Sequence, residues 1–101
     1  MTTTNVTFRT VEEAEVVVKY GPVRPDHENR LLTALTEFNN IGLVTESSFE
    51  TGQFTVYIEV EPLVEDDSVE KVIKNTLDEV YGEVAVAKAK VSVDFDSYET
   101  Y

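Results

Sequence analysis

The stretch from Gln53 to Gly82 constrains the fold more than any other part of the chain. It begins with alternating apolar and polar side chains, which is the period of a strand with one buried face. The apolar positions of this strand are Phe54, Val56, Ile58 and Val60. Pro62 then ends the strand, because it has no amide to donate to a sheet. An apolar stripe of helical period from Val69 to Tyr81, closed by Gly82, predicts a helix.

The residues before this stretch predict a strand, a helix and a second strand. Val6 to Tyr20 alternate with period two, and a bulge or bend near Thr10–Glu13 would interrupt so long a strand. An apolar stripe predicts a helix from about Asp26 to Asn40. The polar run Leu43–Glu50 predicts an edge strand, joined through Gly52 to the next strand as a β-hairpin. One side of this edge strand would carry Leu43, Thr45, Ser47 and Phe49.

The chain closes with alternation from about Val84 to Phe95, which predicts the last strand. The resulting order of elements is βαββαβ. It indicates a ferredoxin-like α+β fold, with a four-stranded antiparallel sheet and two helices on one face. In that fold the first and last strands are neighbours. We expect a single domain over residues 1–101, with frayed ends at 1–5 and 96–101.

The uncovered face of this sheet is the candidate partner surface. Its candidate residues are Glu13, Glu15, Val17, Tyr57, Glu59 and Glu61. The expected strand positions put Glu13 and Glu15 across from Lys88 or Lys90, as weak exposed ion pairs. Two interpretations remain open. The face is simply solvated, or it forms a homodimer or partner surface around Tyr57 and Val17.

Charge is the most unusual feature of the composition, with 20 acidic residues against 8 Lys and Arg and a net charge of -12. Such a charge disfavours direct binding to nucleic acid, where cations must displace counterions, and to anionic lipid. Three explanations of this acidity are open: it maintains solubility, it adapts the protein to high salt, or it presents an acidic face to a basic partner. Glu (14) outnumbers Asp (6), which ranks salt adaptation below an acidic face.

The sequence holds no motif that indicates catalysis. There is no cysteine, no glycine-rich phosphate loop, and no apolar run long enough for a bilayer. His27 lacks a nearby nucleophile and is interpreted as a solvated surface histidine, and Glu65–Asp67 lacks the spacing of a calcium loop. We therefore expect a non-enzymatic, cytoplasmic protein without cofactor or metal, native to a cell or delivered by a virus into its host.

Part of the pattern resembles regulatory modules of the ACT and PII type. The segment VVVKY at Val16–Tyr20, the helix LLTALTEFNNIG and the later QFTVYIEVEP and DDSVEKVIKNTL segments follow their strand and helix layout. The resemblance covers about Ala14 to Val93 and implies a ferredoxin-like fold and a regulatory role. It carries over no site residue.

Three functional hypotheses follow. The first is an acidic interaction or regulatory module that acts by protein–protein contact. The second is a phage-type inhibitor, a nucleic-acid mimic that occupies a basic surface of its target. The third is a small-ligand sensor that uses the Gly21–Asn29 loop at an oligomer interface.

Overall fold

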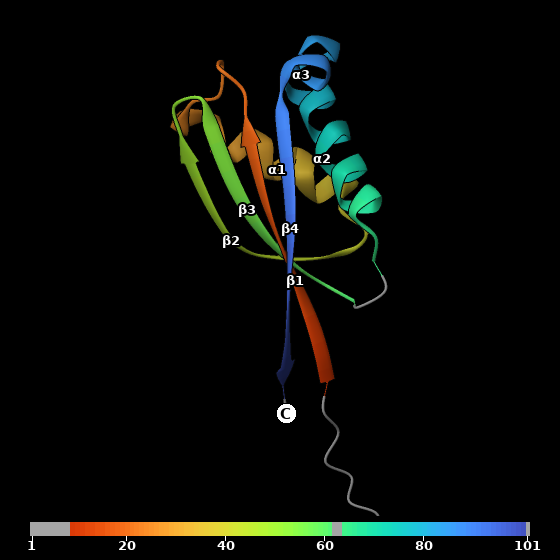
Figure 1. The fold of residues 1–101 in the computed structure, drawn as a ribbon. Coiled ribbons are helices and arrows are strands. Elements are labelled where there is room, and N and C mark those ends of the chain that lie inside the picture. The colour runs from red at the N-terminus through yellow and green to blue at the C-terminus, as the bar shows by residue number, and fades with distance from the viewer. Residues whose placement is uncertain (1–8, 62–63, 101) are drawn as a thin grey trace, which may run out of the picture.

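The structure is a computed structural model that describes residues 9–61 and 64–100, with the backbone alone at 9–11, 66 and 96–100. Its strands are β1 (Arg9–Lys19), β2 (Gly42–Glu50), β3 (Gln53–Val60) and β4 (Lys90–Thr100). They form one antiparallel sheet in the order β2-β3-β1-β4 (Figure 1). The predicted antiparallel sheet is confirmed, and so is the pairing of the first strand with the last. The predicted start of the first strand at Val6 lies outside the described residues.

Helices connect these strands. They are a 3₁₀ turn (Pro25–His27), α1 (Glu28–Phe38), α2 (Asp66–Tyr81) and α3 (Glu83–Lys88). The first helix is thus shorter than the predicted Asp26–Asn40, because its first turn is 3₁₀ and Asn39 has extended backbone angles. Within the described part of the chain, no helix is long and apolar enough to cross a bilayer.

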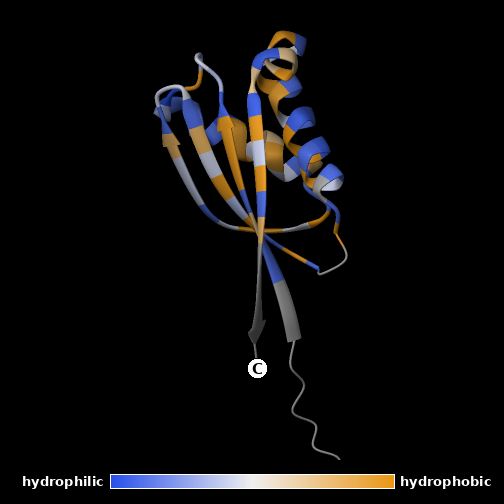
Figure 2. Ribbon diagram, in the orientation of Figure 1, coloured by the Kyte–Doolittle hydropathy of each residue, from blue (hydrophilic) through white to orange (hydrophobic). Residues whose placement is uncertain are grey.

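One face of the sheet is buried in a single hydrophobic cluster. Alternate residues of β1 and β3 supply it, and the strands in Figure 2 accordingly alternate between hydrophobic and hydrophilic colours. Leu31 and Leu35 of α1 and Ile73 and Leu77 of α2 join the same cluster. The strand members with the least exposure are Ala14, Val16, Val18, Val56 and Ile58. Burial of this apolar surface is the main stabilising contribution to the fold.

The β2–β3 hairpin is confirmed, with Gly52 at a positive φ of 81° in its turn. The predicted inward side of β2 is wrong in its first half. A register shift between Val44 and Glu46 turns Val44 toward the cluster and leaves Leu43 67% exposed. One extra residue in a strand reverses the side on which the preceding residues lie, and no glycine lies between Val44 and Glu46 to mark this bulge.

β1 contains no break where one was predicted. Its pairing with β4 is continuous from Arg9 opposite Thr100 to Lys19 opposite Lys90, so the predicted bulge near Thr10–Glu13 is wrong. Pairing with β4 over the whole length stabilises the long strand. β4 reaches Thr100, across most of the segment expected to fray.

The predicted strand from Val84 to Phe95 is wrong in its first half. Glu83–Lys88 forms helix α3, separated from α2 by Gly82 at a φ of 93°. Alanine is the best helix former, and Ala85, Val86 and Ala89 share one helical face that packs on the core. An alternating run with so many small residues fits the period of a strand as well as that of a helix. Burial of Ala85 in the core favours the helix.

Candidate interaction surface

The face of the sheet opposite the hydrophobic cluster, which we call the open face, is organised in rows that run across the four strands. One row is Glu46, Tyr57, Glu15 and Asp94, and the next is Leu43, Glu59, Glu13 and the backbone position of Asp96. Neither row contains a lysine or arginine. The described carboxylates of these rows, Glu13, Glu15, Glu46, Glu59 and Asp94, are defined here as the acidic patch.

Cross-strand pairing brings like charges together in this patch. Glu13 lies directly opposite Glu59 on β3, and Glu15 lies directly opposite Asp94 on β4. The predicted partners of these glutamates are therefore wrong, because Lys88 lies in α3 and Lys90 faces Lys19. The error follows from the misplaced start of the last strand, which shifted its register against β1. Like charges directly opposite each other in a sheet are destabilising.

Tyr57 lies at the centre of the acidic patch. Its hydroxyl donates a hydrogen bond of 2.7 Å to a carboxylate oxygen of Glu15. That bond raises the pKa of Tyr57 above its ordinary 10.0, and desolvation and the nearby charges of Glu15, Glu46 and Glu13 add to the increase. The phenol therefore remains a neutral donor that is bound to one carboxylate, within a depression shared with Glu13 and Asp94.

The six residues predicted for the surface are only partly brought together. Glu13, Glu15, Tyr57 and Glu59 form the two acidic rows, whereas Val17 lies in the neutral row beyond them, opposite Thr55 and Ser92. Glu61 follows the end of β3 and is exposed.

Two further members of the surface were not among those predicted. Glu46 lies on the open face opposite Tyr57, and Leu43 stands exposed beside Glu59 because of the register shift in β2. Asp94 of β4 was likewise not among the six predicted residues. The pairing of Asp94 with Glu15 depends on the register of β4, for which the sequence offers no signal.

The interpretation of His27 as a solvated residue is wrong. Its Nδ1 is hydrogen-bonded to the Tyr81 hydroxyl at 2.9 Å, and the two rings lie 5.7 Å apart. Tyr81 also meets Tyr20 edge-to-face at 5.3 Å. Burial raises the pKa of Tyr81, although the charge of Arg30 acts in the opposite direction. His27 thus fastens the start of α1 to the end of α2.

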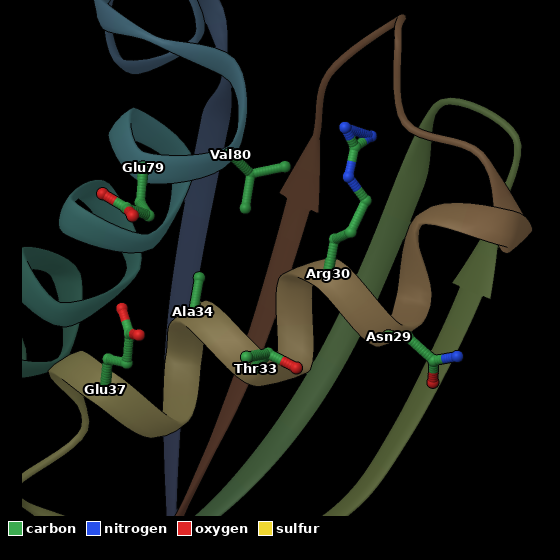
Figure 3. A pocket seen from close by; sticks show the side chains of 7 residues that line it. All are labelled: Asn29, Arg30, Thr33, Ala34, Glu37, Glu79 and Val80. Atoms are coloured by element: carbon green, nitrogen blue, oxygen red, sulfur yellow. The ribbon is translucent and has the colours of Figure 1, made fainter.

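A groove runs between α1 and α2, as Figure 3 shows. Ala34 and Val80 lie in it, and the carboxylates of Glu37 and Glu79 approach it from the two helices while Arg30 points away from them (Figure 3). None of these charged side chains makes a hydrogen bond or ion pair with the described residues. The groove is thus lined by polar and apolar side chains of both helices, Thr33 among them.

Metal ligands do not converge in the described parts of the chain, where no group of three or more His, Asp or Glu residues could hold an ion. The acidic patch spreads along four strands instead of surrounding a point, and hard cations need several oxygens at one centre. Its chemistry is therefore that of an extended anionic surface.

Comparison with known proteins yields no family. No family model matches the chain, and no curated protein matches it. Among solved structures the chain is similar to a de novo designed protein, Foldit4, at 15% identity and a TM-score of 0.42, over 85% of this chain and 96% of that chain. A likeness of that size supports no statement about function, which must be argued from the surface itself.

Proposed function

We propose that the fold is ferredoxin-like, with the βαββαβ order extended by the short helix α3. The strand order β2-β3-β1-β4 and the shared core of α1, α2 and the sheet support this assignment. The regulatory role suggested by the resemblance to ACT and PII modules remains part of the same proposal.

Within this fold, the function that the open face supports best is that of a non-enzymatic interaction module whose acidic patch binds a basic protein surface. The observation that carries the proposal is the cross-strand pairing of Glu15 with Asp94, with Glu13 and Glu46 close by around Tyr57. This arrangement lowers the stability of the free protein. A partner that presents lysine or arginine would remove the repulsion on binding.

Apolar and aromatic groups complete such a surface. Tyr57, oriented by Glu15, supplies a rigid amphipathic side chain of the kind enriched at interfaces. Leu43 adds an exposed apolar side chain next to Glu59. Together they offer contact area beside the charges that would steer and orient the partner.

The charge of the patch favours a partner of opposite sign over a second copy of the chain. Two copies that met acidic patch to acidic patch would bring their carboxylates together, and like-charge contacts across an interface are unfavourable. Phosphate backbones and anionic lipids would be repelled in the same way. We therefore infer that the partner is a basic protein. Under the inhibitor hypothesis, the surface that the acidic patch occupies is one that normally binds nucleic acid.

Binding of a fluorescent ten-residue lysine peptide, followed by anisotropy at low salt, tests this function. The triple variant Glu13→Gln, Glu46→Gln, Asp94→Asn removes three charges from the acidic patch. The control Glu37→Gln, Asp78→Asn, Glu79→Gln removes an equal number of charges from exposed positions on α1 and α2.

The patch variant should bind the peptide about tenfold more weakly than the native chain, whereas the control should change by less than about twofold. Equal weakening by both variants would show that only net charge matters and would contradict the proposal. Raising the salt should weaken native binding, since salt screens the attraction between exposed charges, which extends only about 8 Å at physiological ionic strength.

A further inference from the structure

Three lysines gather at the end of the sheet where β1 stops and β4 starts. Lys19 is the last residue of β1, Lys90 is the first of β4, and Lys88 is the last of α3. They line a hollow of about 520 Å³ together with Tyr20, Gly52 and Val84, which we call the lysine pocket. Figure 1 shows the β1 end, the β2–β3 turn and α3 at this same end of the molecule.

The charge of the lysine pocket is unusual for this chain. Three of the 8 Lys and Arg residues meet here, although 20 acidic residues are available as partners. In the parts of the chain that the structure describes, none of the three makes an ion pair, whereas Lys74 pairs with Glu70 at 3.2 Å. Lys19 lies directly opposite Lys90 on one side and opposite Gln53 on the other. Like charges that face each other across strands lower the stability of a sheet, so a contribution to stability does not explain why these lysines lie together.

The acidic patch is too far away to neutralise these lysines. Lys19 and Glu15 are four residues apart on β1, which corresponds to about 13 Å along a strand. The intervening row contains only neutral side chains, Ser48, Thr55, Val17 and Ser92. Interactions between exposed charges more than about 8 Å apart are largely screened at physiological salt. The lysine pocket and the acidic patch therefore behave as separate sites.

The walls of the lysine pocket are held in place by main-chain hydrogen bonds. The Tyr20 amide donates to the Gly52 carbonyl at 3.0 Å, and the Gly52 amide donates to the Val23 carbonyl at 2.7 Å. The space beside Gly21 and Gly52 is open, since a Cβ at either position would have no atom within 4 Å. The ring of Tyr20 is fixed by its edge-to-face contact with Tyr81. A preformed site loses less entropy on binding.

One wall of the pocket is apolar and faces solvent. Val84 is 58% exposed and is one of two large apolar side chains in the described residues that stand free in this way. Exposed apolar surface beside convergent polar groups is typical of small-molecule sites. The pocket therefore combines a cationic rim with a patch that suits the apolar body of a ligand.

We propose that the lysine pocket binds a small organic phosphate, with the phosphate held by Lys19, Lys88 and Lys90 and an apolar or aromatic body against Val84 and Tyr20. Lysine binds phosphate as a point charge, and three ammonium groups match an anion with two or more charges. Such a ligand would remove the repulsion between Lys19 and Lys90 and would stabilise the end of the sheet. This site is independent of the acidic patch and of its basic partner.

Isothermal titration with two probes tests the assignment. Tripolyphosphate reports on charge alone, and phenyl phosphate reports on charge together with an apolar body. The variant Lys88→Gln, Lys90→Gln should bind tripolyphosphate about tenfold more weakly or worse, since hydrogen bonds to charged groups contribute most. The control Lys71→Gln, Lys74→Gln, which removes two exposed lysines from α2, should bind within about twofold of the native chain.

A Val84→Ala variant separates the two parts of the site. It should weaken binding of phenyl phosphate and leave binding of tripolyphosphate unchanged. Failure of the native chain to bind either probe at millimolar concentration, or equal loss in the α2 control, would overturn the proposal. Unchanged phenyl phosphate binding by Val84→Ala would overturn the apolar half of it. Removing Lys88 and Lys90 charges should not lower the melting temperature, which shows that a loss of binding is not a loss of fold.

Discussion

The two faces of this sheet follow opposite rules. On the buried face, apolar residues oppose each other, as Val16 does with Val56 and Val93. On the open face, Glu15 opposes Asp94 and Lys19 opposes Lys90, so like charges face each other across neighbouring strands. Cross-strand pairs stabilise a sheet in the first case and destabilise it in the second. The buried face therefore provides most of the stability of the sheet. The open face can for that reason tolerate unfavourable charge pairs that favour ligand binding.

The largest effect should come from the buried face. Ile58→Ala removes a fully buried side chain from β3, and loss of such a group with the cavity it leaves costs about 2–5 kcal/mol of unfolding free energy. Thr55→Ala, on the open side of the same strand, should cost less than about 1 kcal/mol. Urea denaturation measures both variants. Similar losses for the two would remove the distinction between the faces.

A close backbone approach should give the next largest effect. A Cβ at Gly42 would clash with the Glu59 carbonyl oxygen and lie 2.9 Å from Cγ1 of Val60. Gly42→Ala must therefore displace β2 from β3, at a cost of about 1–3 kcal/mol. Gly21→Ala, where the new Cβ meets no atom within 4 Å, is the matched control and should be tolerated. A neutral Gly42→Ala in thermal unfolding would show that the β2 edge yields easily.

Substitutions in the acidic patch should have a smaller effect of opposite sign. Glu13→Gln removes one carboxylate from the group that Glu13 forms with Glu15 and Asp94, and it should raise the unfolding free energy at low salt by about 0.2–1 kcal/mol. The gain should shrink as salt screens the charges of the native chain. Glu50→Gln, opposite the neutral Gln53, should change stability less. Destabilisation by Glu13→Gln would mean that the carboxylate contributes to folding, against our account.

The smallest effect is on the ionisation of Tyr57. Carbon-13 NMR of its ring should show a pKa above the ordinary 10.0, and Glu15→Gln should lower that pKa. Because the pKa is higher in the folded than in the unfolded chain, the stabilisation is complete below the unfolded value and is lost as pH rises through the folded one. Glu50→Gln should leave the titration of Tyr57 unchanged. An ordinary pKa in the native chain would argue against the bond to Glu15.

Much of the fold could be predicted from period alone. The strand β3 and the helix α2 have strong, unambiguous patterns with bulky residues at the buried positions, such as Ile58 and Leu77. The segment Glu83–Lys88 does not, because its small residues satisfy strand and helix periods equally. Only the burial of Ala85 against the rest of the core distinguishes them.

The open face could be predicted as a set of residues but not as a pattern of neighbours. Alternation places Glu13, Glu15 and Tyr57 on one side of their strands. Which charges oppose which depends on where β4 begins and on the bulge between Val44 and Glu46, and both are set by tertiary contacts. That is why the opposed pairs, the exposure of Leu43 and the lysine pocket were not predicted.

One NMR experiment tests the segregation of charge most directly. The native chain, labelled with nitrogen-15, is titrated separately with the lysine peptide and with tripolyphosphate. The peptide should shift amides around Glu15, Tyr57 and Asp94, and tripolyphosphate should shift amides around Lys19 and Lys90, with little overlap between the two sets. Shifts from either probe that spread evenly over α1 and α2, or that coincide on one set of residues, would contradict the account of two separate sites.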